Sequence, residues 1–210
     1  MWAVTAVITL AEKPTLVGER VLLRPVGAAD ADGLLELTSD QEVTRLTGSH
    51  PGRPMGRDAL MEWYGSRGDH AHRLDLAIID RSTDAYVGEA VLNELDVESG
   101  SCNFRIALVG PRAFGRGYGT EATRLILAHG FETVGLHRIE LQVFDFNPRA
   151  RRLYDNVGFV HEGTRRDALR WDGAWVDAHD MSILADEWRQ HRGHPVDYQM
   201  QIERSGEAGL

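Results

Sequence analysis

The stretch VGPRAFGRGYGTEA, residues Val109 to Ala122, joins a predicted strand to a predicted helix. Gly115, Gly117 and Gly119 stand at alternate positions, so the backbone can approach a ligand closely and turn its N–H groups toward it. Those donors point the same way as the positive end of the following helix, which favours an anion. Arg116 adds a positive charge and Thr120 a hydroxyl. The segment therefore predicts a phosphate-binding turn.

Three interpretations of this turn compete. A Walker loop is excluded, because no Gly-Lys-Ser/Thr follows at the required spacing. A dinucleotide fingerprint is a rival, since Gly117-x-Gly119-x-x-Ala122 matches it and Glu140 is an acid at nearly the expected distance. Against it, Pro111 and several further residues separate the strand from the first matching glycine. The third interpretation is a glycine turn that only packs a helix on a sheet.

A second motif follows about thirty residues later. The stretch NPRARRLYDNVGF, residues Asn147 to Phe159, predicts a short helix over Asn147–Asn156 that ends at Gly158. Taken alone, it is compatible with an ordinary amphipathic helix in which Tyr154 is a core aromatic.

Together the two segments resemble the GNAT superfamily of N-acetyltransferases. The family's usual loop is Gln/Arg-x-x-Gly-x-Gly/Ala, which Gly117 and Gly119 match and from which Phe114 departs. The ribosomal-protein N-terminal acetyltransferase branch often has a large aromatic there, followed by Gly-Lys/Arg-Gly-Tyr and Thr-Glu-Ala. The second segment is similar to Asn-x-x-Ala/Ser-x-x-x-Tyr-x-x-x-Gly-Phe, matched by Asn147, Ala150, Tyr154, Gly158 and Phe159.

The resemblance implies an acyl-CoA-dependent N-acyltransferase that uses acetyl-CoA, or a bulkier acyl donor, as co-substrate. It implies that a pyrophosphate is held by the turn, and that the strand ending at Val109 splays away from His137–Phe144 to leave an edge for the pantetheine amides. The residues expected to bind the coenzyme are Ala107, Leu108, Val109, Phe114, Gly115, Arg116, Gly117, Tyr118, Gly119, Thr120, Asn147 and Arg152.

A thioester is already activated, so direct attack by an amine in a ternary complex needs no covalent nucleophile. The resemblance makes Tyr154 the expected general acid for the departing thiolate. We expect Glu89 to be the base, with Glu94, Asp96, Glu140 and Asp180 as rivals. The ribosomal-protein branch often has Glu where Asn103 stands. Because an amide cannot accept the proton, this departure puts that branch's base and substrate in doubt.

The pattern of elements predicts one domain around a central sheet. We expect strands over Val17–Val26, Leu74–Asp80, Tyr86–Leu95, Ser101–Val109, His137–Phe144, Phe159–Arg170 and Ala174–Leu184. We expect a helix that is capped by Asp30 and runs through Leu37, and a helix over Val43–Leu46 behind a Ser39/Glu42 capping box. We expect further helices over Arg57–Tyr64, Gly117–Val134 and Asn147–Asn156. Closely spaced strands favour antiparallel pairing, and the later strand–helix–strand unit requires a parallel neighbour. The predicted fold class is therefore α/β (α+β), with a mixed, mostly antiparallel sheet and flanking helices; the resemblance names it the GNAT fold.

Composition limits the function. The 210 residues carry a formal net charge of −9, which suits a cationic partner better than nucleic acid. A single cysteine, Cys102, precludes an internal disulfide and fits the cytoplasm, and the nine histidines show no metal-ligand spacing. No segment predicts a membrane span. We expect a leader or extra strand over residues 1–14, the enzyme domain over 15–190 and a polar tail over 191–210.

The sequence does not identify the acyl acceptor. The resemblance implies an amine substrate, which is a protein N-terminus or a small molecule such as an aminoglycoside or polyamine, and it allows a homodimer. Two alternatives come from other classes of protein. One is an NAD-dependent oxidoreductase, and the other is a non-catalytic coenzyme-A-binding regulatory module that keeps the fold without the chemistry.

Overall fold

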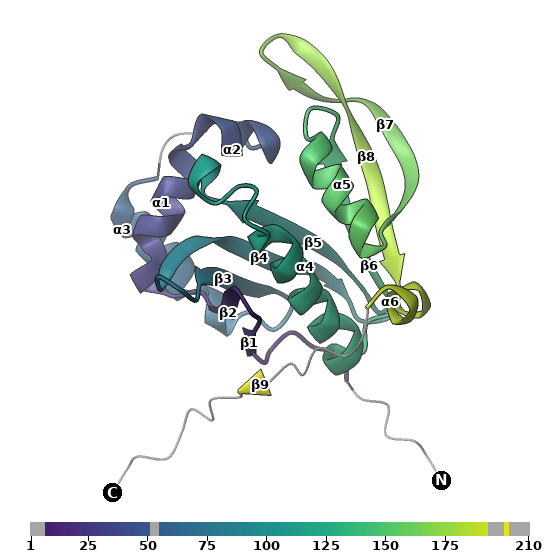
Figure 1. The fold of residues 1–210 in the computed structure, drawn as a ribbon, viewed down its shortest axis with the longest axis horizontal. Coiled ribbons are helices and arrows are strands. Elements are labelled where there is room, and N and C mark those ends of the chain that lie inside the picture. Colours follow the sequence, from purple (N-terminus) through teal and green to yellow (C-terminus); the bar gives the residue numbers. More distant parts are fainter. Residues whose placement is uncertain (1–6, 51–54, 193–199, 202–210) are drawn as a thin grey trace, which may run out of the picture.

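The computed structural model describes residues 7–50, 55–192 and 200–201 (Figure 1). The predicted leader and tail therefore lie partly outside the described residues. Residues 7–14 form no strand, although Leu10 is buried. Among the described helices none is long and apolar enough to cross a membrane.

One sheet organises the fold. Its strands are β1 Thr15–Val17, β2 Val21–Pro25, β3 Leu74–Asp80, β4 Ala85–Asp96, β5 Ser101–Leu108, β6 Arg138–Phe144, β7 Val160–Trp171, β8 Ala174–Leu184 and β9 Met200–Gln201. Their order is β7-β8-β6-β5-β4-β3-β2-β1-β9, and within the described residues only the β5–β6 pair is parallel. This confirms the predicted mixed, mostly antiparallel sheet.

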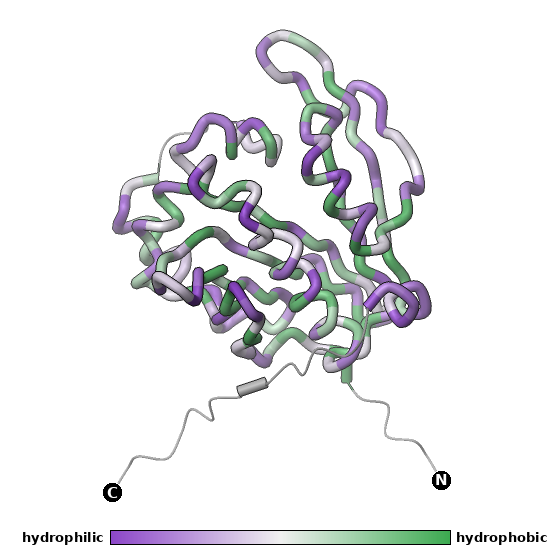
Figure 2. Tube along the Cα trace, in the orientation of Figure 1, coloured by the Kyte–Doolittle hydropathy of each residue, from purple (hydrophilic) through white to green (hydrophobic). Residues whose placement is uncertain are grey.

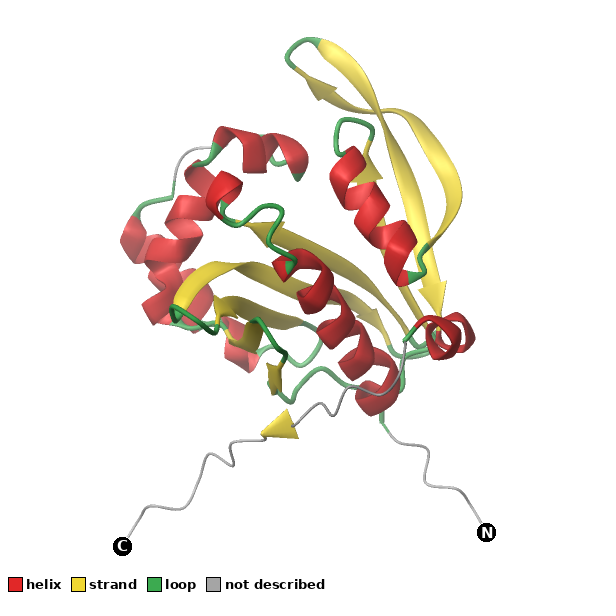
Figure 3. Ribbon diagram, viewed as in Figure 1, coloured by secondary structure: helices red, strands yellow, loops and turns green. Residues whose placement is uncertain are grey.

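Helices cover the sheet (Figure 3). They are α1 Ala31–Ser39, α2 Gln41–Leu46, α3 Arg57–Gly65, α4 Tyr118–Ala128, α5 Pro148–Val157 and α6 Ala185–His191, and a π-helical turn, His129–Val134, extends α4. Helix α4 packs across strands β1 to β5 and contacts α5, which lies beside β6 and the β7–β8 hairpin (Figure 1).

The buried residues follow the periods of the helix and the strand. One helix face is buried, formed by Ala122, Leu125 and Ile126 on α4 and by His129 just after it. On β6, Ile139, Leu141 and Val143 are buried and Glu140 and Gln142 are exposed, and Figure 2 shows such alternation along the strands. Burial of one helix stripe against one sheet face is what holds the layers together.

The sheet opens between β5 and β6. These strands pair only at Ser101–Asn103 against Arg138–Glu140. Beyond that point β5 continues to pair with β4 as far as Leu108, while β6 pairs with β8 as far as Phe144. The expected splay is therefore present, and among the described residues the β6-side edge of β5 has no strand partner over residues 104–108.

Three local predictions were wrong. The single strand Val17–Val26 is a hairpin, because Gly18 turns the chain and its N–H donates to the Val21 carbonyl at 2.9 Å. Asp30 does not cap α1 with its side chain; its carboxylate instead pairs with Arg24 at 2.7 Å. Asp40, not Ser39, caps α2, since its carboxylate accepts from the N–H groups of Glu42 and Val43.

The two predicted strands Phe159–Arg170 and Ala174–Leu184 are present as β7 and β8, and they form a hairpin. Strands β7 and β8 pair around Asp172 and Gly173, whose φ angles are 48° and 83°. Two successive left-handed residues are what a tight turn between right-twisted strands requires. The hairpin projects beyond the sheet toward α2 (Figure 1).

Candidate active site

A cavity of about 1030 Å³ occupies the gap between the splayed strands. Its walls come from the separated parts of β5 and β6, from the glycine turn at the start of α4, and from α5 and α2. A long ligand can therefore run from the helix end of the cavity along the open edge of β5.

The glycine turn forms the helix end of this cavity. Gly115 and Gly117 have φ angles of 72° and 84°, in the left-handed region that favours glycine. Gly117 is the N-cap residue of α4, and no side chain in the described part of the chain caps that helix end. The first N–H groups of α4 are thus left for a ligand at the positive end of the helix dipole. A Cβ at Gly119 would lie 3.2 Å from Leu153 on α5, so glycine there also permits close packing.

Most of the predicted coenzyme-binding residues meet in this cavity. Those that line it are Ala107, Leu108, Phe114, Gly115, Gly117, Gly119, Thr120, Asn147 and Arg152. Val109, Arg116 and Tyr118 are not among its lining residues. Val109 is buried, the Arg116 carbonyl accepts from Arg20 at 3.0 Å, and the Tyr118 hydroxyl donates to Asp80 at 2.6 Å. These three residues therefore support the turn without lining the cavity.

Phe114 and Arg149 stack on each other in the wall of the cavity. The Arg149 guanidinium, from α5, lies 3.7 Å from the centre of the Phe114 ring, and both side chains line the cavity. Arg149 also comes within 4.0 Å of Glu42 on α2. The first loop position, where the family pattern has Gln or Arg, is thus an aromatic ring with an arginine held on it. The sequence prediction missed Arg149, although it stands inside the second motif.

Tyr154 lies on α5 and lines the cavity. Its ring packs edge-on against Phe104 and Phe159, with centroid distances of 6.3 Å and 5.7 Å. Burial raises the pKa of the Tyr154 phenol, with no compensating charge. The phenol is therefore protonated at neutral pH, as a general acid must be.

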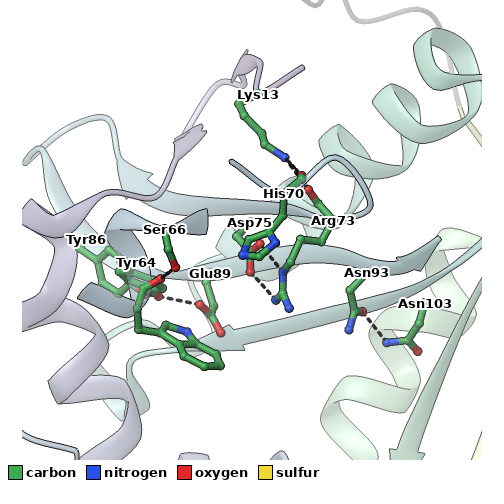
Figure 4. Close-up of polar contacts among 11 residues, drawn as sticks. Lys13, Tyr64, Ser66, His70, Arg73, Asp75, Tyr86, Glu89, Asn93 and Asn103 are labelled. Carbon is green, nitrogen blue, oxygen red and sulfur yellow. Dashed lines mark hydrogen bonds and ion pairs between the residues drawn. The ribbon is translucent and has the colours of Figure 1, made fainter. Parts of the chain in front are cut away.

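Glu89 lies outside this cavity, on β4. Its carboxylate accepts a hydrogen bond of 2.6 Å from Tyr64, whose hydroxyl is 2.9 Å from that of Tyr86 (Figure 4). Arg73 and Asp75 form an ion pair beside this group, with a closest approach of 2.7 Å. Burial raises the pKa of Glu89, which makes it a better proton acceptor near neutral pH.

The rival carboxylates separate into two groups. Glu94, Glu140 and Asp180 line the cavity, and Asp96 does not, because its carboxylate accepts from the N–H groups of Glu98 and Ser99. Asn103 also lines the cavity, and its amide donates to Asn93 at 2.9 Å. The interior thus offers carboxylates, with Asn103 at the position where the ribosomal-protein branch often has Glu.

The α2 wall of the cavity is the part that the sequence left unassigned. The cavity is lined by Val43 and Leu46 on α2 and by Thr47 just after it, and also by Phe144 at the end of β6. No motif marks these residues, since their place depends on how α2 packs across the gap. Among the described residues, no three His, Cys, Asp or Glu side chains are grouped to hold a metal ion.

These features together define a class of protein that binds a coenzyme A thioester. An open strand edge, a helix N-terminus with bare N–H groups and a buried tyrosine together suit a coenzyme A thioester. The dinucleotide alternative does not fit, since that fold has a mostly parallel sheet, whereas among the described strands here every pairing except β5–β6 is antiparallel.

Comparison with known proteins agrees with this class. Residues 20–160 match the Acetyltransferase (GNAT) domain family. An uncharacterised N-acetyltransferase of Bacillus licheniformis, p20, is 30% identical over 83% of this chain and 98% of its own length. The chain therefore belongs to the GNAT family, and it is an acetyl-CoA-dependent N-acetyltransferase.

Two solved structures show the same fold. The spermidine N-acetyltransferase of Vibrio cholerae, in complex with CoA and spermine, superposes with a TM-score of 0.74 at 24% identity, covering 82% of this chain and 99% of that one. A GCN5-related N-acetyltransferase of Brucella melitensis gives a TM-score of 0.71 at 24% identity, covering 86% and 83%.

Proposed function

We propose that the enzyme transfers an acetyl group from acetyl-CoA directly to a primary amine while both substrates are bound. The observation that carries this proposal is the single cavity that joins the glycine turn, the open β5 edge and Tyr154. Donor and acceptor can meet there without a covalent enzyme intermediate, because a thioester already has a good leaving group.

The proposed donor site binds the coenzyme mainly through backbone groups. The pyrophosphate lies at the bare start of α4, and the pantetheine amides take the hydrogen bonds that β5 leaves open over residues 104–108. Arg149 and Arg152 on α5 add positive charge at the cavity wall.

Proton transfers complete the reaction. The amine nitrogen attacks the carbonyl carbon, the C–N bond forms, and collapse of the adduct breaks the C–S bond. The departing sulfur takes the proton of the Tyr154 phenol, and the nitrogen gives up a proton to water or a carboxylate. Glu89 stays our proposed base, acting through an intervening water because its side chain does not line the cavity. Glu94, Glu140 and Asp180 are nearer alternatives.

The test of the proposed function is thiol release from acetyl-CoA in the presence of a panel of amines, with the acetylated product identified by mass. Thiol release that depends on an amine supports direct transfer. Tight acetyl-CoA binding without turnover on any amine would instead support the non-catalytic module.

The Arg149 contribution to the donor site has a matched control. Arg149→Met should raise the Kd for coenzyme A roughly ten-fold, since a cation near a phosphate contributes about 1–2 kcal/mol. Arg151→Met removes the same charge from the same helix at a residue that does not line the cavity. Calorimetric titration of both variants checks this, and equal affinities in the two would remove Arg149 from the donor site.

A further inference from the structure

A second hollow lies at the tip of the β7–β8 hairpin, separate from the donor cavity. Its volume is about 660 Å³, and it is lined by Arg45, Asp145, Phe146, Trp171, Asp172, Ala174, Trp175, Val176 and Asp177. We call it the hairpin hollow. Chain neighbours connect its wall to that of the active-site cavity: Leu46 and Phe144 line the cavity, and the adjacent Arg45 and Asp145 line this hollow.

Aromatic rings make up much of the wall, and cations already lie on them. The Arg45 guanidinium is 4.6 Å from the centre of the Phe146 ring, and that of Arg170 is 5.8 Å from the Trp175 ring. Trp171 packs edge-on against Phe146 at 6.4 Å between centroids. Trp175 keeps 61% of its surface exposed. His50 stacks on Trp171 at 5.2 Å between ring centroids, so the exposed Trp175 ring is the aromatic surface that stays open to a further positive group.

The charges of the hollow also favour a positively charged ligand. Three carboxylates line it, from Asp145, Asp172 and Asp177, against one guanidinium, from Arg45. Asp177 accepts the N–H of Asp167 at 2.8 Å, and Asp145 is bonded to the imidazole of His179, so both carboxylates are held in place. Fixed anions beside aromatic faces match an organic cation in both charge and shape.

We propose that the hairpin hollow binds a second cationic group of the acyl acceptor, while the reacting amine reaches the thioester in the main cavity. This inference rests on the proposed function and narrows it: the acceptor is a small, flexible molecule with at least two amino groups. A protonated amine held in the hollow positions the other end of the molecule, which enters the main cavity between α2 and β6. The unreacted nitrogen keeps its charge throughout.

The first experiment compares acceptors on the wild-type enzyme. Thiol release from acetyl-CoA is measured with a monoamine, with linear α,ω-diamines of increasing length, and with a short peptide that has only its α-amino group. We expect kcat/KM to be at least about ten-fold higher for a diamine of the best length than for the monoamine. Equal values for the monoamine and the diamines, or a preference for the peptide, would overturn the inference and leave the proposed function standing. No thiol release with any amine would contradict the proposed function itself.

The second experiment removes the site. The double variant Asp172→Asn/Asp177→Asn keeps side-chain size and should raise KM for the preferred diamine about five-fold or more, with no change in KM for the monoamine or for acetyl-CoA. Trp171→Leu should act in the same direction. Asp155→Asn, an exposed residue of α5 that does not line either hollow, is the matched control for loss of charge. A similar change for diamine and monoamine, or an equal effect of the control, would show that the hollow does not bind the acceptor.

Discussion

At the residue scale, Gly117 combines a backbone requirement with a binding role. Its φ of 84° is left-handed, and an added Cβ would lie 3.1 Å from the Arg20 guanidinium that braces the turn. The glycine spacing could be recognised in the sequence, and so could Tyr154, because both belong to short contiguous motifs. The Arg149–Phe114 stack could not, since it joins residues from two separate segments.

Gly117→Ala should weaken coenzyme A binding at least about ten-fold, because the turn must shift the N–H groups at the start of α4. The same change should cost about 1–2 kcal/mol of stability, the usual penalty for a left-handed alanine. Gly135→Ala is the matched control, since its φ is 81° and an added Cβ meets nothing within 4 Å. Thermal unfolding should show both penalties, and titration should show lost affinity only for Gly117→Ala. Unchanged affinity in that variant would remove the turn from the donor site.

Tyr154→Phe should lower kcat about 100-fold and leave KM for acetyl-CoA nearly unchanged, since only the acid step is lost. Because burial raises the pKa of this phenol above its ordinary value near 10, it stays protonated through the whole alkaline range of an assay. Wild-type kcat should therefore show no decline attributable to Tyr154 between about pH 7 and pH 9.5. A full rate in the phenylalanine variant would end its role as an acid.

At the element scale, sequence patterns predicted where regular structure lies better than how it begins. The predicted strand Leu74–Asp80 coincides with β3, since its apolar run is buried on both faces. Helix starts were harder: Ser39 and Asp40 are adjacent residues that can both act as caps, and only the path of the chain between α1 and α2 selects Asp40. The π-helical turn His129–Val134 after α4 was predicted only as part of one continuous helix.

That turn makes stability depend on pH through His129. The side chain is buried, and burial lowers its pKa to about 4 from a reference value of 6.5. Between these pH values the His129 imidazole is protonated in the unfolded chain but stays neutral in the folded chain. The free energy of unfolding therefore falls as pH drops from about 6.5 to about 4. His129→Leu should flatten this part of the curve, removing a loss of about 2–3 kcal/mol. Urea unfolding at several pH values measures it, with the exposed His72→Gln as control. An unchanged slope in His129→Leu would assign the acid sensitivity to other groups.

At the scale of the whole molecule, function follows from one interruption in an otherwise continuous sheet. Periodicity predicts which residues face the core, but the divergence of β5 from β6 depends on pairing between strands thirty residues apart and on the helices between them. Family resemblance alone gave that expectation. The α2 wall and the hairpin hollow have no local signature either, because each brings together segments distant in sequence.

Hydrogen exchange tests this interruption directly. Within residues 7–50, 55–192 and 200–201, the β5 edge over 104–108 lacks a strand partner on the β6 side, so we expect the amides on that edge to exchange with solvent unless a ligand covers them. Acetyl-CoA should slow exchange there by at least about ten-fold, and at a hundred times its Kd it should add about 2.7 kcal/mol to global stability.

Strand β3, paired on both sides by β2 and β4, is the internal reference. Its exchange should slow only as far as the added free energy of global unfolding requires. NADH at the same concentration should protect neither strand. If acetyl-CoA protects β3 and β5 equally, the ligand stabilises the whole fold without occupying the open edge, and the pantetheine must be placed elsewhere.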